Sequence, residues 1–540
     1  MTITEQLVEL AAEFWQWRAA YQPVTSDDLA RLERPANWQA DWSAASIERQ
    51  RAQLELFEER WRRLDHSGEP VATEIDHRLI GSALARVRWE LDVTRGWRRS
   101  PKFYVDQTLV ALFEALLRPA PFESARGEEL IRLLRNIPRT LEAGRINLAA
   151  EAVQPFAQAA LALLAGVRSR LDRVRSELKP LLAAGCAERF DQALTAAIES
   201  FESFQAWIEE RLPSMPEDSA VGRDAYLFFL REVALMPYTP EQLLVMGQQE
   251  WERALAFEAI AQERARRTPP LPLFPDQAAQ VAREAEDELK IRRFLEEQNL
   301  LTVPAWVRHY RNLPMPSYLL PLSDLGVADD LTSPNRLHED GISYIFPPSP
   351  NLWYFALASA RDPRPIIVHE GVPGHYFQMV LAWAHEDPIR RHYYDSGPME
   401  GIGFYSEELM VQAGLFDDSP RTREIMYNFM RLRALRVEVD VKLALGLFTI
   451  DQAADYLQTR TPMDAETARF EAVFFASIPG QAITYQIGKL QILKFLAEAR
   501  QILGAGFNLR AFHDYLWKNG NVPISLQRLE YLGLRDEQGL

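Results

Sequence analysis

Apolar residues recur at helical spacing along most of this 540-residue sequence. A helix that buries one face carries apolar residues at positions i, i+3, i+4 and i+7, whereas a half-buried strand alternates apolar and polar residues. Five long segments follow the helical pattern: residues 43–66, 104–118, 127–147, 149–178 and 186–211. The same spacing resumes at Trp353 and continues to about residue 518. The sequence therefore predicts a mainly α protein.

Proline residues punctuate these segments and mark turns between the predicted helices. In Tyr238-Thr239-Pro240-Glu241, a threonine that can cap a helix is followed by a proline, which is favoured at the first helical position. We therefore expect a helix to begin at Pro240.

The charge and the apolar runs of the chain exclude several classes of partner. The net charge is −16, whereas nucleic acids and anionic membranes require a basic protein face. The longest apolar run, residues 159–167, is too short to span a bilayer, and the first residues lack a secretion signal. A single cysteine, Cys186, excludes an intramolecular disulfide and a cysteine-rich metal cage. We expect a cytoplasmic protein with no nucleic-acid or membrane partner.

One short segment, His369-Glu370-Gly371-Val372-Pro373-Gly374-His375, contains two imidazoles and a carboxylate, which a catalytic zinc site requires. The histidines stand at i and i+6, whereas the common motif has them at i and i+4. On a regular helix this spacing separates them by about 120° and about 9 Å, too far to share one ion. Because Pro373 and Gly374 can break a helix, we predict a looped or bulged insertion that turns His375 back towards His369.

Two less specific interpretations compete with this site. A chance occurrence of the pattern in a long chain is one of them. The chain also contains a second His-Glu pair, His385-Glu386, with His392 further along. Because Asp387 and Pro388 follow that pair directly, we interpret it as a solvated helix end and turn.

Other residues extend the proposed metal site. Glu400 follows His375 by 25 residues, near the start of a helix that we expect to open with Ser396-Gly397-Pro398, and is the candidate third ligand. The two histidines would bind as neutral imidazoles, and Glu370 would activate a water molecule. Glu407 and Glu408 lie two turns after Glu400. Either is a candidate for hydrogen bonding to a ligand histidine; the alternative, above all for Glu408, is a surface charge.

A glycine-bracketed segment at residues 479–488 carries an amide, Gln481, and a phenol, Tyr485. Tyr485 is the first candidate to donate a hydrogen bond to a developing oxyanion, and Tyr405 is a weaker one. The alternative for both is a core tyrosine.

Arg436 and Asp440 stand at i and i+4 of a predicted helix and most simply form a surface salt pair. The alternative is that Arg436 or Arg433 binds the terminal carboxylate of a peptide substrate.

The character of the sequence changes between residues 303 and 350, where prolines are frequent and residues 341–346 alternate. We expect short strands there. An edge strand beside a zinc site commonly holds the backbone of a peptide substrate, so residues 341–346 are a candidate for that role. The alternative is an ordinary connecting hairpin.

The sequence resembles a bacterial family catalogued as domain of unknown function 885, over nearly the whole chain. The resemblance rests on three groups of residues: His-Glu-Gly-Val-Pro-Gly-His-Tyr-Phe-Gln at 369–378, Glu400-Gly401 with Tyr405 and Glu407, and Pro479-Gly480-Gln481-Ala482 with Tyr485 and Gly488. The chain departs from the family pattern at Ile402-Gly403, where Trp-Ala is frequent, and at Ala444, where histidine is frequent.

That family is similar in fold to carboxypeptidase Taq, a helical gluzincin. The resemblance implies a helical body with a deep cleft, zinc held by His369, His375 and Glu400, and Glu370 as the general base. Residues 1–300 would form one side of the cleft and residues 301–540 the catalytic region of one continuous two-lobed body.

These features predict a zinc-dependent metallopeptidase that hydrolyses short peptides, with carboxypeptidase-like action as one variant and a homodimer as one possible assembly. Two alternatives stay open. One is a catalytically silent helical protein of the same scaffold that binds a metal or a peptide. The other is a metal amidohydrolase that acts on non-peptide amides.

Overall fold

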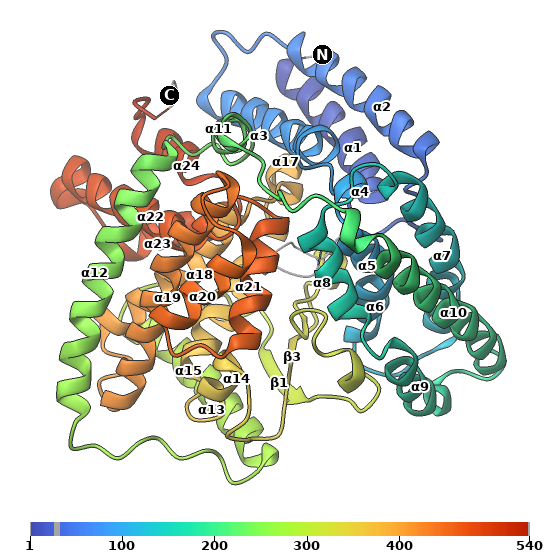
Figure 1. Ribbon diagram of the computed structural model, residues 1–540. Helices are drawn as coiled ribbons and strands as arrows, with labels where there is room; N and C mark the ends of the chain where they lie inside the picture. Colours follow the sequence, from blue (N-terminus) through green and yellow to red (C-terminus); the bar gives the residue numbers. More distant parts are fainter. Residues whose placement is uncertain (1, 26–32, 538–540) are drawn as a thin grey trace.

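The computed structural model describes residues 2–25 and 33–537, and most of these residues are helical (Figure 1). The prediction of a mainly α fold is confirmed. Among the described residues, no helix is both long enough and apolar enough to cross a lipid bilayer.

Three of the five segments with helical spacing each form a single helix: α2 (Ala44–Arg62), α7 (Ser124–Leu148) and α10 (Ala187–Arg211). The segment 104–118 lies within a continuous helical stretch made of α5 (Pro101–Val105), a π-helical turn (Asp106–Val110) and α6 (Ala111–Leu117). The segment 149–178 is divided into α8 (Gln154–Leu164) and α9 (Val167–Leu178). The division occurs at Gly166, whose φ of 64° is left-handed and favours glycine.

The helices up to α10 form one half of the molecule, coloured blue to green in Figure 1. They share a continuous apolar core in which Phe14, Phe113 and Phe201 are fully buried. The remaining helices of this half are α1 (Ile3–Tyr21), α3 (Val71–Arg88) and α4 (Gly96–Arg99).

The other half is built around a long helix pair, α12 (Pro240–Ala265) and α19 (Pro420–Ala444), which pack along one another (Figure 1). Helix α12 begins where the sequence predicts, because Thr239 and Gln242 form a capping box. Helix α13 (Gln277–Glu297) packs against the β-sheet. Both α12 and α13, which precede residue 300, therefore pack on helices and strands of the later region.

Three short strands form one sheet in the order β1-β3-β2, which confirms the expected strands. Strand β1 (Tyr310–Pro314) runs parallel to β3 (Gly341–Ile345), and β2 (Asp329–Asp330) runs antiparallel to it. The prediction that residues 341–346 form an edge strand is wrong, because β3 is paired on both sides. Strand β1 pairs with all five residues of β3, and β2 pairs with Ile342 and Ser343 on its other side.

The remaining helices lie between residues 223 and 532. They are α11 (Arg223–Phe228), α14 (Tyr354–Ser359), α15 (Arg364–Ile366), η8 (Ile367–Gly371), α16 (His375–Trp383), α17 (Pro388–His392), α18 (Ser396–Ala413), α20 (Ile450–Arg460), α21 (Ala465–Ser477), α22 (Ile483–Leu503), α23 (Leu509–Asn519) and α24 (Ile524–Leu532). Helix α24 extends the helical region beyond the end expected near Gly520.

Candidate metal centre

The chain breaks its helix between the two histidines of the motif. His369 lies in η8, a π-helical turn closed by a hydrogen bond from the Val372 amide to the Ile367 carbonyl, and α16 begins at His375. A Cβ atom on Gly374 would lie 1.7 Å from the His369 carbonyl oxygen, so this turn requires glycine. The imidazole centroids are 4.6 Å apart. The predicted break at this point, which turns His375 back towards His369, is confirmed.

Glu400 joins the two histidines from α18. Its Oε2 atom lies 3.4 Å from His369 Nε2, and its Oε1 atom lies 3.4 Å from His375 Nε2. In a tetrahedral zinc site with bonds of about 2.0–2.1 Å, neighbouring ligand atoms are about 3.3 Å apart. All three side chains are buried. The structure thus places Glu400 at the distance from each histidine that a shared metal ion would require.

Helix α18 is capped one residue earlier than expected. The Asp395 side chain, and not Ser396, accepts a hydrogen bond from the Gly397 amide. An ion pair with Arg86 of α3, at 2.7 Å, also holds Asp395. The start of the helix that carries Glu400 is therefore fixed from the other half of the molecule.

Glu370 is the solvent-facing member of the group. Its carboxylate lies 4.0 Å from His375 Nε2, and its side chain is 28% exposed, whereas those of both histidines are 5% exposed. His369, Glu370 and His375 each have one potential ligand atom within 4.8 Å of those of the other two residues. This position allows Glu370 to contact both the metal centre and incoming solvent, as a general base must.

Glu407 orients the first histidine. Its Oε1 atom lies 2.7 Å from His369 Nδ1 and 2.8 Å from Nη2 of Arg433, which extends from α19. An ionised Glu407 carboxylate can only accept a hydrogen bond, so with Glu407 ionised a proton on Nδ1 would leave the lone pair of Nε2 for a metal. Burial lowers the pKa of His369 to about 3, so its imidazole is neutral at pH 7. Burial also raises the pKa of Glu407 to about 7, an effect that Arg433 opposes.

The charges of the site indicate which ion it fits. With their carboxylates ionised, Glu370, Glu400 and Glu407 carry three negative charges, which the Arg433 guanidinium reduces to two. Buried charges are costly unless they are compensated. A divalent cation among two imidazoles and a carboxylate would neutralise the remainder, so the donor set fits zinc or a similar ion.

Tyr485 stacks on His369, with ring centroids 6.2 Å apart and planes inclined by 14°. It lies in the first turn of α22, and the preceding turn is held by Asp440, which accepts hydrogen bonds from the amides of Gly480 and Ala482 and from the Tyr226 hydroxyl. The structure therefore brings Tyr485 to the metal centre. Gln481 is buried in the same turn.

The expected salt pair between Arg436 and Asp440 is wrong. The amides of the turn before α22 occupy Asp440, and Arg436 instead pairs with Glu471 of α21, with Nε 3.2 Å from Oε2. The Arg436 guanidinium also lies 4.5 Å from the centroid of the Tyr485 ring. Both partners of the pair are buried, so Arg436 is not a surface charge.

The structure does not bring Tyr405 to the metal centre. Its hydroxyl lies 2.8 Å from His513 Nε2, in an apolar cluster with Trp517. Tyr405 follows Glu400 by five residues, which places it about 140° around the helix, whereas Glu407 is only about 20° away. The helical period thus explains why Glu407 faces the metal centre and Tyr405 does not.

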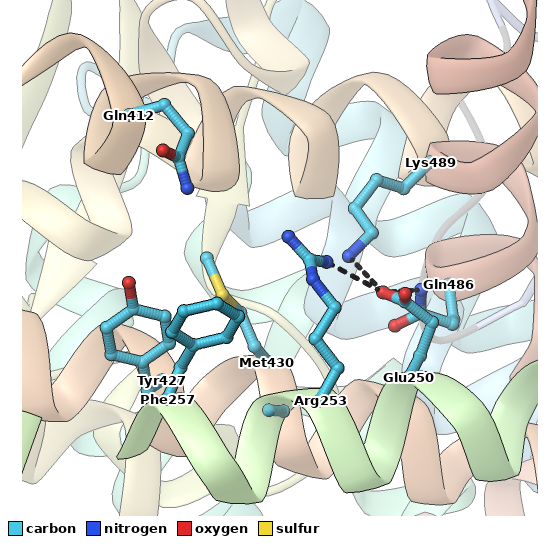
Figure 2. Close-up of a pocket in the computed structure, with 9 residues that line it drawn as sticks. Glu250, Arg253, Phe257, Gln412, Tyr427, Met430, Gln486 and Lys489 are labelled. Carbon is cyan, nitrogen blue, oxygen red and sulfur yellow. Dashed lines mark hydrogen bonds and ion pairs between the residues drawn. The ribbon is translucent and has the colours of Figure 1, made fainter. Parts of the chain in front are cut away.

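Glu408 is buried, so its interpretation as a surface charge is wrong. It pairs with Lys489 at 2.7 Å and with Arg253. Figure 2 shows the neighbouring contacts of Lys489 and Arg253 with Glu250, at 2.9 and 3.1 Å. Glu250, Arg253 and Lys489 line a small pocket that none of the candidate metal ligands lines.

Sequence reasoning missed two features of the site. One is the contact of Arg433 with Glu407, since the sequence indicates only a surface position or a substrate clamp for Arg433 and Arg436. The other is the close crossing of α18 and α22 at Gly401 and Gly488. The spacing of Gly397 and Gly401, one helical turn apart, is a signal in the sequence that could have indicated this crossing.

Comparisons with known proteins agree with the sequence resemblance and the fold. The model of a bacterial protein family of unknown function (DUF885) matches residues 29–311 and 331–529. A solved structure described as "a putative lipoprotein of unknown function from Shewanella oneidensis" has a TM-score of 0.71 and 15% identity. Another, "the putative lipoprotein from Colwellia psychrerythraea", has a TM-score of 0.78 and 17% identity. Each alignment covers 98% of this chain and 99% of the other. No curated protein matches the sequence.

Proposed function

The chain belongs to the DUF885 family of bacterial proteins, and from this premise we propose that it is a zinc-dependent metallopeptidase that hydrolyses short peptides. One observation carries the proposal: the Glu400 carboxylate lies 3.4 Å from the Nε2 atoms of both His369 and His375. Three protein ligands of this kind are typical of catalytic zinc sites, which leave a further position for water or substrate.

Zinc held by these three residues would polarise a substrate carbonyl and activate water near neutral pH. Glu370 would accept a proton from the attacking water and pass it to the departing amine. Tyr485 would donate a hydrogen bond to the negative charge that develops on the carbonyl oxygen. Glu407 would hold His369 in the tautomer that presents Nε2.

The burial of the site supports short peptides as substrates. The side chains of His369, His375 and Glu400 are at most 5% exposed, and the more accessible Glu370 is still largely covered. A flexible peptide can enter such a site in an extended conformation, whereas a folded protein surface cannot. Carboxypeptidase-like action is one form of this proposal.

The location and the assembly of the protein stay predictions from the sequence. Two solved structures of similar fold are described as putative lipoproteins. We take from them the fold alone and not the description as a lipoprotein. Fractionation of cells that express the protein from its own gene would test the cytoplasmic location.

The proposal is tested with a purified protein that carries no histidine tag. We expect about one zinc per chain in the wild type, a large loss of zinc in His375→Ala, and hydrolysis of members of a short-peptide library. Glu370→Gln should keep its zinc but lose hydrolysis. Turnover by Glu370→Gln at the wild-type rate would contradict the assigned base. A wild type without zinc, even after reconstitution, would instead favour a silent binding protein.

A further inference from the structure

Among the residues that the structure describes, Arg433 has one polar contact shorter than 3 Å, with the carboxylate beside the first candidate ligand. Its Nη2 atom lies 2.8 Å from Glu407 Oε1, and the same oxygen lies 2.7 Å from His369 Nδ1. Nη2 itself is 3.5 Å from Nδ1. One carboxylate oxygen therefore lies within ion-pair distance of two nitrogen atoms, one on α19 and one on η8.

Aromatic rings surround the rest of the guanidinium. Its Cζ atom lies between 5.4 and 5.9 Å from the ring centroids of four residues: Phe355, Phe404, Phe429 and Tyr485. The Nε and Nη1 atoms of Arg433 are buried and have no hydrogen-bond partner among the described residues. A planar guanidinium packs well against aromatic rings, which hold it at little cost in side-chain entropy. The position of Nη2 is therefore fixed independently of Glu407.

We infer that Arg433 is a positioning residue of the metal centre, which acts on the metal through Glu407 and His369. The guanidinium of an arginine is always positively charged, so its fixed Nη2 atom attracts the Glu407 carboxylate and selects where its oxygen lies. That oxygen in turn sets the plane of the His369 imidazole and therefore the direction of Nε2. This inference rests on the metal site of the proposed function, but it does not depend on which bond the protein hydrolyses.

Zinc affinity, measured by competition with a chelator of known strength, is the first readout. Loss of a group that orients a metal ligand typically weakens binding by about 10–100-fold. We expect Arg433→Met to weaken zinc binding by this factor. Arg433→Lys keeps the charge but not the planar fork, so it should recover part of the affinity. The visible absorption of the cobalt-substituted protein should change in Arg433→Met, because the ligand geometry changes.

Arg431→Met is the matched control. Arg431 lies on the same helix and pairs with the buried Glu258 at 3.0 Å, so its loss disturbs α19 in a similar way. We expect Arg431→Met to lower stability but to keep wild-type zinc affinity and the wild-type cobalt spectrum. Zinc affinity and a cobalt spectrum equal to wild type in a folded Arg433→Met protein would overturn the inference. Equal losses in both variants would overturn it as well, since they would indicate a structural effect alone.

These outcomes are separate from those that test the proposed function. If the wild type binds zinc but hydrolyses no peptide, the proposed activity fails and the inference about Arg433 is still tested by affinity. If Arg433→Met binds zinc normally while the wild type hydrolyses peptides, only the inference fails. If Arg433→Met does not fold, Arg433→Lys decides the test. We then expect Arg433→Lys to bind zinc measurably more weakly than the wild type. An unchanged zinc affinity would contradict the inference.

Discussion

Gly401 of α18 lies directly against Gly488 of α22. A Cβ atom placed on Gly401 would be 2.8 Å from the Cα atom of Gly488, and one placed on Gly488 would be 2.4 Å from the carbonyl oxygen of Gly397. The two helix backbones therefore touch. This contact brings Tyr485, three residues before Gly488, beside the helix that carries Glu400. The crossing of two glycine-containing helices thus shapes the metal centre as much as the ligands do.

Gly488→Ala should separate α18 from α22. Inserting a methyl group into a packed contact typically costs about 1–3 kcal/mol, and here the atoms it meets are backbone atoms that cannot rotate away. We expect the free energy of unfolding in urea to fall by about that amount and zinc to bind more weakly, because Glu400 and Tyr485 move apart.

Gly506→Ala is the control for this prediction. A Cβ atom at Gly506 would meet no other atom within 4 Å, so this substitution should change neither stability nor zinc binding. If Gly488→Ala were as stable as Gly506→Ala and bound zinc as tightly, the close crossing would not matter for the site.

Helical periodicity predicted the elements of the fold better than their arrangement. It identifies the face of a helix that is buried, but not the partner that buries it. For this reason the start of α12 at Pro240 could be predicted from its local cap, whereas its packing against α19 could not. The alternation in residues 341–346 predicted a strand in the same way. Whether that strand lay at an edge depended on β1 and β2, which pair with it from distant positions in the sequence.

The candidate site shows the same limit. Glu407 could be proposed as a partner of a ligand histidine because it lies two helical turns after Glu400, on the same face of the helix. That relationship is purely local. The expected pair of Arg436 with Asp440 was also local, and it was wrong because tertiary partners compete for both side chains. The backbone amides of a turn 40 residues later occupy Asp440, and Glu471 occupies Arg436. Local pairing rules hold best on exposed helices, and α19 is largely buried.

Tyr485→Phe tests the proposed hydrogen bond to the oxyanion. Removing one such donor typically lowers kcat by about 100–1,000-fold. We expect a loss of this order in peptide hydrolysis, with zinc content unchanged because Tyr485 stacks on His369 through its ring, which phenylalanine keeps. The measurement is steady-state kinetics on a peptide that the wild type hydrolyses.

Tyr405→Phe is the matched variant, because Tyr405 lies on α18 but bonds to His513. It should leave kcat nearly unchanged and lower stability by about 1–3 kcal/mol, the cost of an unpaired buried polar group. Equal effects of the two substitutions on kcat would contradict the role assigned to Tyr485.

Arg436→Met tests whether this arginine is structural or binds the carboxyl end of a substrate. Because its partner Glu471 is buried, removing the guanidinium should lower the free energy of unfolding by about 3–5 kcal/mol. Adding Glu471→Gln removes the uncompensated charge and should restore much of that loss. A urea denaturation series on the two single variants and the double variant gives the coupling.

Kinetics on paired peptides with free and amidated carboxyl ends complete this test. For a structural role, the preference between the two peptides should be the same in the double variant as in the wild type. A fully stable Arg436→Met protein with a raised KM only for the free acid would instead identify Arg436 as a carboxylate clamp.

Glu284 of α13 predicts a specific pH dependence of stability. Burial raises its pKa to about 7, although Gln280 and Ser359 donate hydrogen bonds to its Oε1 atom. In the unfolded chain the pKa of a glutamate is about 4.3, so the folded state holds this proton more tightly. The stabilisation from Glu284 is therefore complete below about pH 4.3 and is lost as the pH rises through about 7.

Glu284→Gln removes this titration. Between pH 5 and pH 8 the wild type should lose roughly 2–3 kcal/mol of its free energy of unfolding through Glu284, and the variant should not. The stability of the variant relative to the wild type should therefore rise by that amount. Glu286→Gln, an exposed position on the same helix, should follow the wild type at both pH values. Urea denaturation of all three proteins at pH 5 and pH 8 measures the difference. A Glu284→Gln protein whose stability changes in parallel with the wild type would show that Glu284 stays ionised in the folded protein, which would require solvent or a cation to reach its carboxylate.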